Sequence, residues 1–151
     1  MNPPPDAAPS RPFHILLVED APGDIRLTFE AFKKATIESL LHTVQDGQEA
    51  LDFLEQKGLH SGAPRPDLVL MDLNLPKLHG FDLLTRIKAN DRLKNIPIVI
   101  LTSSQNEEDI QKAYELQANC YLLKPSKLED FFQIIRGVEE FWLSLVKLPS
   151  L

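Results

Sequence analysis

The chain has a single cysteine, Cys120, so no disulfide can form within it, and only a bridge between two chains stays open. No apolar run approaches the roughly 20 residues that a membrane-crossing helix needs. The amino terminus lacks the basic start and apolar stretch of a secretory signal. These absences fit a reducing compartment, and they predict a cytoplasmic protein without a membrane segment.

Basic residues are outnumbered, since 16 Lys and Arg stand against 22 Asp and Glu, for a formal net charge of −6. Such a chain repels a phosphate backbone unless its basic residues form a concentrated patch, so nucleic acid is not expected as a partner. Residues 1–12, "MNPPPDAAPSRP", read as a disordered lead. The 151-residue chain is long enough for one domain with a single core.

Short apolar runs alternate with stretches of helical period from Phe13 onward, which predicts βαβ units and an α/β fold with a parallel sheet. Strands are expected at 14–18, 39–43, 67–71, 96–101 and 120–123. Helices are expected at 24–34, 48–57, 81–90, 107–116 and 128–146. The last helix is unusually long, because its apolar period continues past Gly137 into an extension at 137–151.

Polar side chains follow four of these strands. Glu19 and Asp20 follow the first, Asp72 the third, Thr102 the fourth and Lys124 the fifth. Ligands of open α/β sheets bind at the carboxyl ends of the strands, so these side chains are predicted to share one crevice.

The clustered carboxylates would repel one another and raise their own pKa values unless a divalent cation neutralised them. Mg²⁺ suits this role, because it prefers carboxylates, waters and phosphate oxygens. A lysine and a hydroxyl beside the metal are donors suited to a phosphoryl group. We therefore predict that Asp72 is a nucleophile that accepts a phosphoryl group.

Each of these residues also has an ordinary interpretation. A Glu-Asp pair is usually an exposed loop or a helix cap, a lone threonine is more often a hydroxyl at the edge of a core, and Lys-Pro is more often a turn. The phosphoacceptor interpretation is favoured because all four strand ends carry complementary groups at once.

Four motifs add a family resemblance: "VED" at 18–20, "LVLMDLNLP" at 68–76 followed by "HGFDLL", "IVILTSS" at 98–104 and "CYLLKP" at 120–125. With them, the segment 13–136 resembles the receiver domains of two-component response regulators. The resemblance implies a flavodoxin-like, doubly wound sheet of strand order 2-1-3-4-5. One departure is His79, where receivers more often have Asp or Asn, and a histidine near the pocket could confer pH sensitivity.

The resemblance also implies roles for single residues. The acidic pocket is Glu19, Asp20 and Asp72, and Mg²⁺ is held by Asp20, Asp72 and the backbone carbonyl of Asn74. Asp72 is the phosphoacceptor, and Thr102 and Lys124 contact the phosphoryl group. Tyr121 is an aromatic switch that fills the space vacated by Thr102, and the peptide bond before Pro125 is cis. Beyond self-phosphorylation from small donors and self-dephosphorylation, no enzymatic activity is implied.

More narrowly, "EDAPGDIRL" at 19–27, "KGLHSGAPRP" at 57–66 and the long last helix are similar to single-domain regulators paired with bacterial phytochrome histidine kinases. A sensor histidine kinase is thus the expected partner. Because no segment follows Leu151, we expect the output to be contact with another protein. We also expect a homodimer through the fourth helix, fifth strand and fifth helix, with Phe141, Trp142, Leu145 and Val146 forming a patch that needs covering.

Three other classes of protein share parts of this pattern. A haloacid-dehalogenase-like phosphatase has a second carboxylate two residues after the nucleophile, and this chain has Asn74 there. A flavodoxin-like cofactor carrier is disfavoured, because three clustered carboxylates would repel its bound phosphate unless a metal were present. An interaction module without phosphoryl chemistry is disfavoured by the intact pocket and is separated from a phosphoacceptor only by assay.

Overall fold

Five parallel strands form one sheet in the order β2-β1-β3-β4-β5. They are β1 (Phe13–Val18), β2 (Ser39–Val44), β3 (Leu68–Met71), β4 (Ile98–Thr102) and β5 (Cys120–Leu123). The computed structural model describes residues 11–35 and 37–145, so most of the predicted disordered lead and Val146 lie outside the described residues. The predicted fold class and strand order are confirmed.

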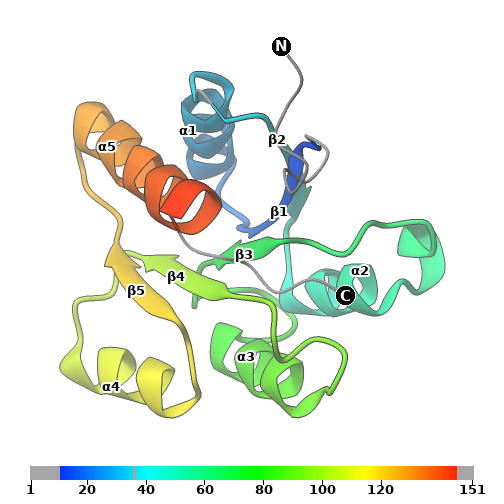
Figure 1. Cartoon of the computed structure of the whole chain (residues 1–151). Coiled ribbons are helices and arrows are strands. Elements are labelled where there is room, and N and C mark those ends of the chain that lie inside the picture. The colour runs from blue at the N-terminus through cyan, green and yellow to red at the C-terminus, as the bar shows by residue number, and fades with distance from the viewer. Residues whose placement is uncertain (1–10, 36, 146–151) are drawn as a thin grey trace.

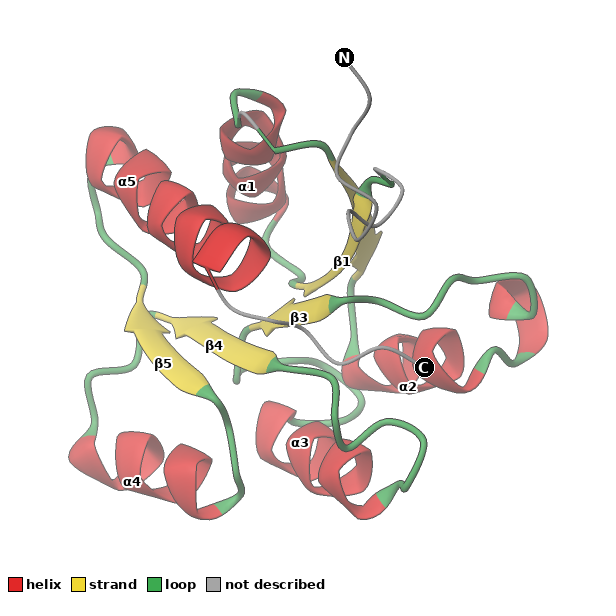
Figure 2. Ribbon diagram, in the orientation of Figure 1, coloured by secondary structure: helices red, strands yellow, loops and turns green. Residues whose placement is uncertain are grey.

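Helices cover both faces of the sheet (Figure 1 and Figure 2). The helices α1 (Pro22–Lys33) and α5 (Leu128–Val138) lie on one face, and α2 (Gly47–Glu55), α3 (Gly80–Ala89) and α4 (Glu107–Glu115) lie on the other. A short 3₁₀ turn at Gly58–His60 follows α2 and was not predicted. Within the described residues, no helix is both long and apolar enough to span a bilayer.

The central strands are buried on both faces, which explains their continuous apolar runs. Ile15 packs into the core beneath α1 and α5, whereas its neighbour Leu16 packs into the core beneath α2, α3 and α4. Successive side chains of a strand point to opposite faces, so each strand contributes to both cores. All four residues of β3 are buried, and this makes β3 a rigid support for whatever follows it.

The last helix departs from its predicted form. The α-helix ends at Val138 and Glu139–Leu145 continue as a π-helix, so the predicted α-helical geometry is wrong for residues 139–145. The next buried apolar residue after Val138 is Leu143, five positions on, as expected for i→i+5 hydrogen bonding. The wide turn accompanies the burial of Glu139, whose carboxylate accepts a hydrogen bond from the Ile37 N–H at 3.0 Å.

The start of the described chain is tied to the sheet. Arg11, placed in the disordered lead from sequence, forms two hydrogen bonds to the Asp67 carboxylate, at 2.8 and 3.0 Å. That carboxylate also accepts from the His14 N–H at 2.9 Å. Arg11 therefore belongs with the folded part of the chain.

Candidate functional site

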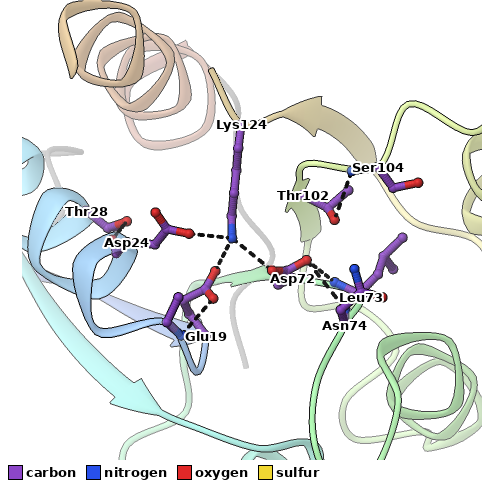
Figure 3. Close-up of polar contacts among 10 residues, drawn as sticks. Glu19, Asp24, Thr28, Asp72, Leu73, Asn74, Thr102, Ser104 and Lys124 are labelled. Atoms are coloured by element: carbon purple, nitrogen blue, oxygen red, sulfur yellow. Dashed lines mark hydrogen bonds and ion pairs between the residues drawn. The ribbon is translucent and has the colours of Figure 1, made fainter. Parts of the chain in front are cut away.

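A cluster of charged side chains lies at the carboxyl ends of the strands (Figure 3). The Lys124 ammonium, just after β5, donates to Glu19 after β1 at 2.6 Å and to Asp72 after β3 at 2.8 Å. It also donates to Asp24 in the first turn of α1 at 2.9 Å. An ammonium has three N–H donors, so every donor of Lys124 is engaged by a carboxylate.

This cluster is buried and carries an excess of negative charge. Glu19 is 3% exposed and Asp72 is 8% exposed. Burial raises the pKa of Glu19, and this effect exceeds the opposing hydrogen bond and charge of Lys124. Burial also acts to lower the pKa of Lys124, but its hydrogen bonds to Asp24, Asp72 and Glu19 outweigh burial and raise it. One ammonium among three carboxylates leaves a deficit of positive charge.

The backbone around Asp72 fixes the orientation of its carboxylate. The carboxylate accepts the Leu73 N–H at 2.6 Å through Oδ1, which directs Oδ2 to Lys124. Gly80 packs directly on this segment, because a Cβ added there would lie 2.7 Å from the Leu73 Cα and 2.9 Å from the Asp72 carbonyl oxygen. The Gly80 N–H donates to the Leu73 carbonyl at 2.9 Å. The glycine of the "HGF" motif therefore holds the Asp72 loop in place.

The predicted switch residues lie next to this cluster. Thr102 is fully buried at the end of β4, the strand beside β3. Its backbone carbonyl accepts a hydrogen bond from the backbone N–H of Lys124 at 2.8 Å. The Tyr121 hydroxyl donates to the carbonyl oxygen of Ser104 at 2.9 Å. Tyr121 is thus bonded to the loop that follows Thr102.

The remaining predicted metal ligands are accessible. Asp20 and Asn74 are exposed, and they follow the neighbouring strands β1 and β3. Within residues 11–35 and 37–145, no three His, Cys, Asp or Glu side chains converge as a metal cluster. Two carboxylates and one carbonyl are nevertheless the donor set of a hard cation that keeps several waters, so the residues fit a divalent metal.

The cis peptide bond predicted before Pro125 is wrong. Among the described residues no peptide bond is cis. Trans is the favoured isomer even before proline, by roughly 0.5–1 kcal/mol, and Lys124 reaches all three carboxylates with a trans bond.

Comparison with known proteins accounts for this arrangement. The model of the response regulator receiver domain matches residues 15–136. The chain belongs to the response regulator receiver family. It is 49% identical to response regulator Rcp1 of the cyanobacterium Synechocystis over 136 residues, which is 90% of this chain and 92% of Rcp1.

Solved receiver structures agree. The phosphorylated cyanobacterial phytochrome response regulator RcpA superimposes with a TM-score of 0.90 at 48% identity, covering 93% of this chain and all of RcpA. The Mn²⁺-bound form of Rcp1 gives a TM-score of 0.88 at 49% identity, covering 92% of this chain and all of Rcp1. The Rcp1 structure shows that a receiver similar to this chain binds a divalent metal.

One member of this receiver's charged cluster was missed from sequence. Asp24 was interpreted only as an acidic residue of a first helical turn, whereas its side chain contacts Lys124. The signal was available, because a helix that follows a strand begins at the carboxyl edge of the sheet. An acidic residue in its first turn can then face the same crevice.

His79 acts as a helix cap in this receiver. Its Nδ1 accepts the Phe81 N–H at 3.1 Å, at the position before Gly80 and the start of α3. Asp and Asn are common N-cap residues because their side chains accept the same bond, so His79 does here what those residues do elsewhere. The cap requires an unprotonated Nδ1.

The predicted dimer residues of the receiver lie at its carboxyl end. Phe141 is 52% exposed, and Trp142 is partly buried with its ring at 5.3 Å and 89° to that of Phe141. Both border a shallow groove of about 290 Å³ between β5 and α5. The side chain of Leu145 and the whole of Val146 lie outside the described part of the chain.

Proposed function

We propose that this receiver accepts a phosphoryl group on Asp72 from the phosphohistidine of a sensor histidine kinase. The observation that carries the proposal is the geometry of Asp72. Its buried carboxylate stands at the end of a rigid strand, oriented by the Leu73 N–H and paired with the Lys124 ammonium. A carboxylate held in this way is a positioned nucleophile.

In the transfer, the phosphorus–nitrogen bond of the phosphohistidine breaks as a bond from phosphorus to an Asp72 oxygen forms. The Lys124 N–H that Asp72 accepts is then free to donate to a phosphoryl oxygen. The Thr102 hydroxyl donates to a second oxygen, and Tyr121 follows it through the loop at Ser104. Bound Mg²⁺, held by Asp20, Asp72 and the Asn74 carbonyl, would neutralise charge on the carboxylates and the phosphoryl group.

The kinase that we propose as donor belongs to the bacterial phytochrome class. Support comes from RcpA, which is itself a cyanobacterial phytochrome response regulator, and from its similarity along nearly the whole of this chain. The reaction would take place in the cytoplasm. Small donors such as acetyl phosphate would also serve, with slow self-dephosphorylation as the only other activity.

We further propose that the output is a changed protein contact, beginning with a homodimer. The surface is formed by α4, β5 and α5, and it includes the groove beside Phe141 and Trp142 between β5 and α5. Phe141 is exposed and apolar, and a second copy of the groove would cover it. In this proposal residues 13–136 form the receiver and residues 137–151 its extension.

The deciding experiment is intact-mass measurement after incubation with acetyl phosphate and Mg²⁺, with Asp72→Asn as the control. We expect one added phosphoryl group in the wild type and none in the variant. Native size measured on the same samples tests the dimer. Failure of every donor, including a phosphorylated bacterial phytochrome kinase, would make the protein an interaction module without phosphoryl chemistry.

A further inference from the structure

A second cleft lies at the amino-terminal ends of the strands, whereas Asp72 lies at their carboxyl ends. It has a volume of about 560 Å³, against 200 to 320 Å³ for three other hollows of the described surface. Its walls are the end of α2, the segment before β3 and the loop before β4. The four residues of β3 lie between this cleft and Asp72, so the two sites are roughly 13 Å or more apart.

The floor of the cleft is apolar and its rim is basic. Leu54 and Leu93, both buried core residues, form the floor. Three cations, Lys57, Arg65 and Arg92, line the rim with one carboxylate, Glu55. Their formal charges sum to +2, on a chain whose net charge is −6. The rim is therefore a local inversion of the protein's overall charge.

Two of these cations have no carboxylate partner. Lys57 is paired with Glu55, but neither Arg65 nor Arg92 forms an ion pair within residues 11–35 and 37–145. The nearby acids are already engaged, since Asp67 binds Arg11 and Asp91 binds Lys94. Arg65 is half-buried, and burial lowers the pKa of its guanidinium. The charge of Asp67 acts on Arg65 from beyond ion-pair distance, so this partly desolvated guanidinium contacts no carboxylate, and it therefore favours an anionic ligand.

The cleft is also preformed. The Arg65 guanidinium donates to the carbonyl oxygen of Arg92, which fixes its plane and leaves four of its five N–H donors. The Asn90 side chain accepts the Arg92 N–H at 2.9 Å through its oxygen, so its amide N–H groups remain as donors. Ordered donors above an apolar floor of this volume are typical of small-molecule sites.

We propose that this cleft binds a small molecule that carries a phosphate monoester on a ring-sized body with an apolar face. The phosphate would lie against Arg65 and Arg92, and the body would cover Leu54 and Leu93. A phosphate monoester carries about −1.5 to −2 charges near neutral pH, which matches the rim. A guanidinium binds such an oxyanion through two parallel hydrogen bonds. A nucleoside monophosphate and a sugar phosphate are two sources of this chemistry.

The test is calorimetric titration of the full chain with AMP, glucose 6-phosphate, inorganic phosphate and adenosine. EDTA is present, so that no metal draws phosphate to the Asp72 cluster. We expect both esters to bind more tightly than phosphate or adenosine alone, with the tighter ester identifying the source. Arg65→Gln and Arg92→Gln should each weaken binding about tenfold, as expected for a lost charged hydrogen bond.

Two matched controls accompany the variants. Arg86→Gln removes the same charge from an exposed position of α3 outside the cleft and should leave binding unchanged. Asp72→Asn should also leave it unchanged, which separates this proposal from the phosphoacceptor. The proposal is overturned if neither ester binds, if binding survives in both cleft variants, or if a short polyglutamate peptide binds in place of the esters. Thermal unfolding of each variant excludes loss of fold as the cause.

Discussion

Lys124 has three N–H donors and three carboxylate acceptors, so a phosphoryl group can bind it only by displacing one of them. Asp24 is the most exposed of the three, with a side chain 34% exposed, and it does not belong to the proposed metal site. Its charge would both hold Lys124 and repel an incoming phosphoryl group. We therefore propose that Asp24 opposes phosphorylation in the resting state.

We expect Asp24→Asn to be phosphorylated by acetyl phosphate about fivefold faster than wild type, which corresponds to roughly 1 kcal/mol of relieved repulsion. The measurement is the time course of intact mass in Mg²⁺. Glu115→Gln, at the exposed far end of α4, removes one negative charge away from the cluster and should leave the rate unchanged. A slower Asp24→Asn variant would mean that Asp24 positions Lys124 productively.

Glu19 gives a pH dependence of stability. Its folded-state pKa is raised, chiefly by burial, so the folded state binds this proton more tightly than the unfolded state does. The contribution of the group to stability is therefore complete below its ordinary pKa and is lost as pH rises through the raised value. The raised pKa of Lys124 affects protein stability only in the alkaline range. The stabilisation that the charged lysine provides is lost only as pH rises above its ordinary pKa of 10.5.

We therefore expect the unfolding free energy of wild type to fall relative to that of Glu19→Gln as pH rises from about 4 to 7. Urea unfolding of both proteins at the two pH values provides the measurement. A shift in the opposite direction would mean that the Lys124 ion pair, not burial, controls the ionisation of Glu19.

At the scale of single residues, the sequence predicted those groups whose position follows from a strand. Glu19, Asp72 and Lys124 each come directly after an apolar run, and parallel strands bring such residues together. The contact of Asp24 depends on the rotation of α1 about its axis, which composition does not specify. The trans bond before Pro125 could not be foreseen, because both isomers are within about 1 kcal/mol locally.

At the scale of elements, the loop that carries Asp72 depends on its contact with the first residue of α3. We expect Gly80→Ala to destabilise the fold by about 1–3 kcal/mol, because the new methyl group would overlap backbone atoms that have no room to move. Phosphorylation of Asp72 should slow as well. Gly23→Ala, in α1 and in open space, is the matched control and should not destabilise. Equal stability of the two variants would contradict this account.

The last helix shows where sequence periodicity stops being informative. Through Phe131, Ile135 and Val138 the buried positions follow α-helical spacing, and the helix was predicted accordingly. The π turn then moves the buried position to Leu143 and leaves Trp142 only partly covered. This change accompanies the hydrogen bond between Glu139 and Ile37, which are 102 residues apart. No local pattern reports such a contact.

At the scale of the whole molecule, alternation of strand and helix signals was sufficient for the fold. Each central strand is buried on both faces, so its apolar run is continuous and easily recognised. Surfaces are harder to predict, because an apolar residue near a chain end can face a core or a partner. Phe141 is such a residue, and its exposure makes it a sharper test of dimerisation than Trp142.

We expect Phe141→Glu to elute as a monomer under conditions where the wild type elutes as a dimer, because a charge would be placed in the apolar contact. Size-exclusion chromatography with light scattering provides the measurement. Phe29→Glu is a matched control, since Phe29 is 50% exposed on α1, away from this surface. An unchanged size for Phe141→Glu would place the dimer contact elsewhere.

The π-helix has a consequence for sequence length. Because Leu143 lies five positions after Val138, removing one residue between them would restore a spacing of four and turn a different aromatic side chain outward. An insertion or deletion of one residue would thus alter the surface offered by this end of the receiver while leaving the phosphoacceptor pocket untouched. Two receivers with the same pocket could then bind different partners solely because this segment differs in length by one residue.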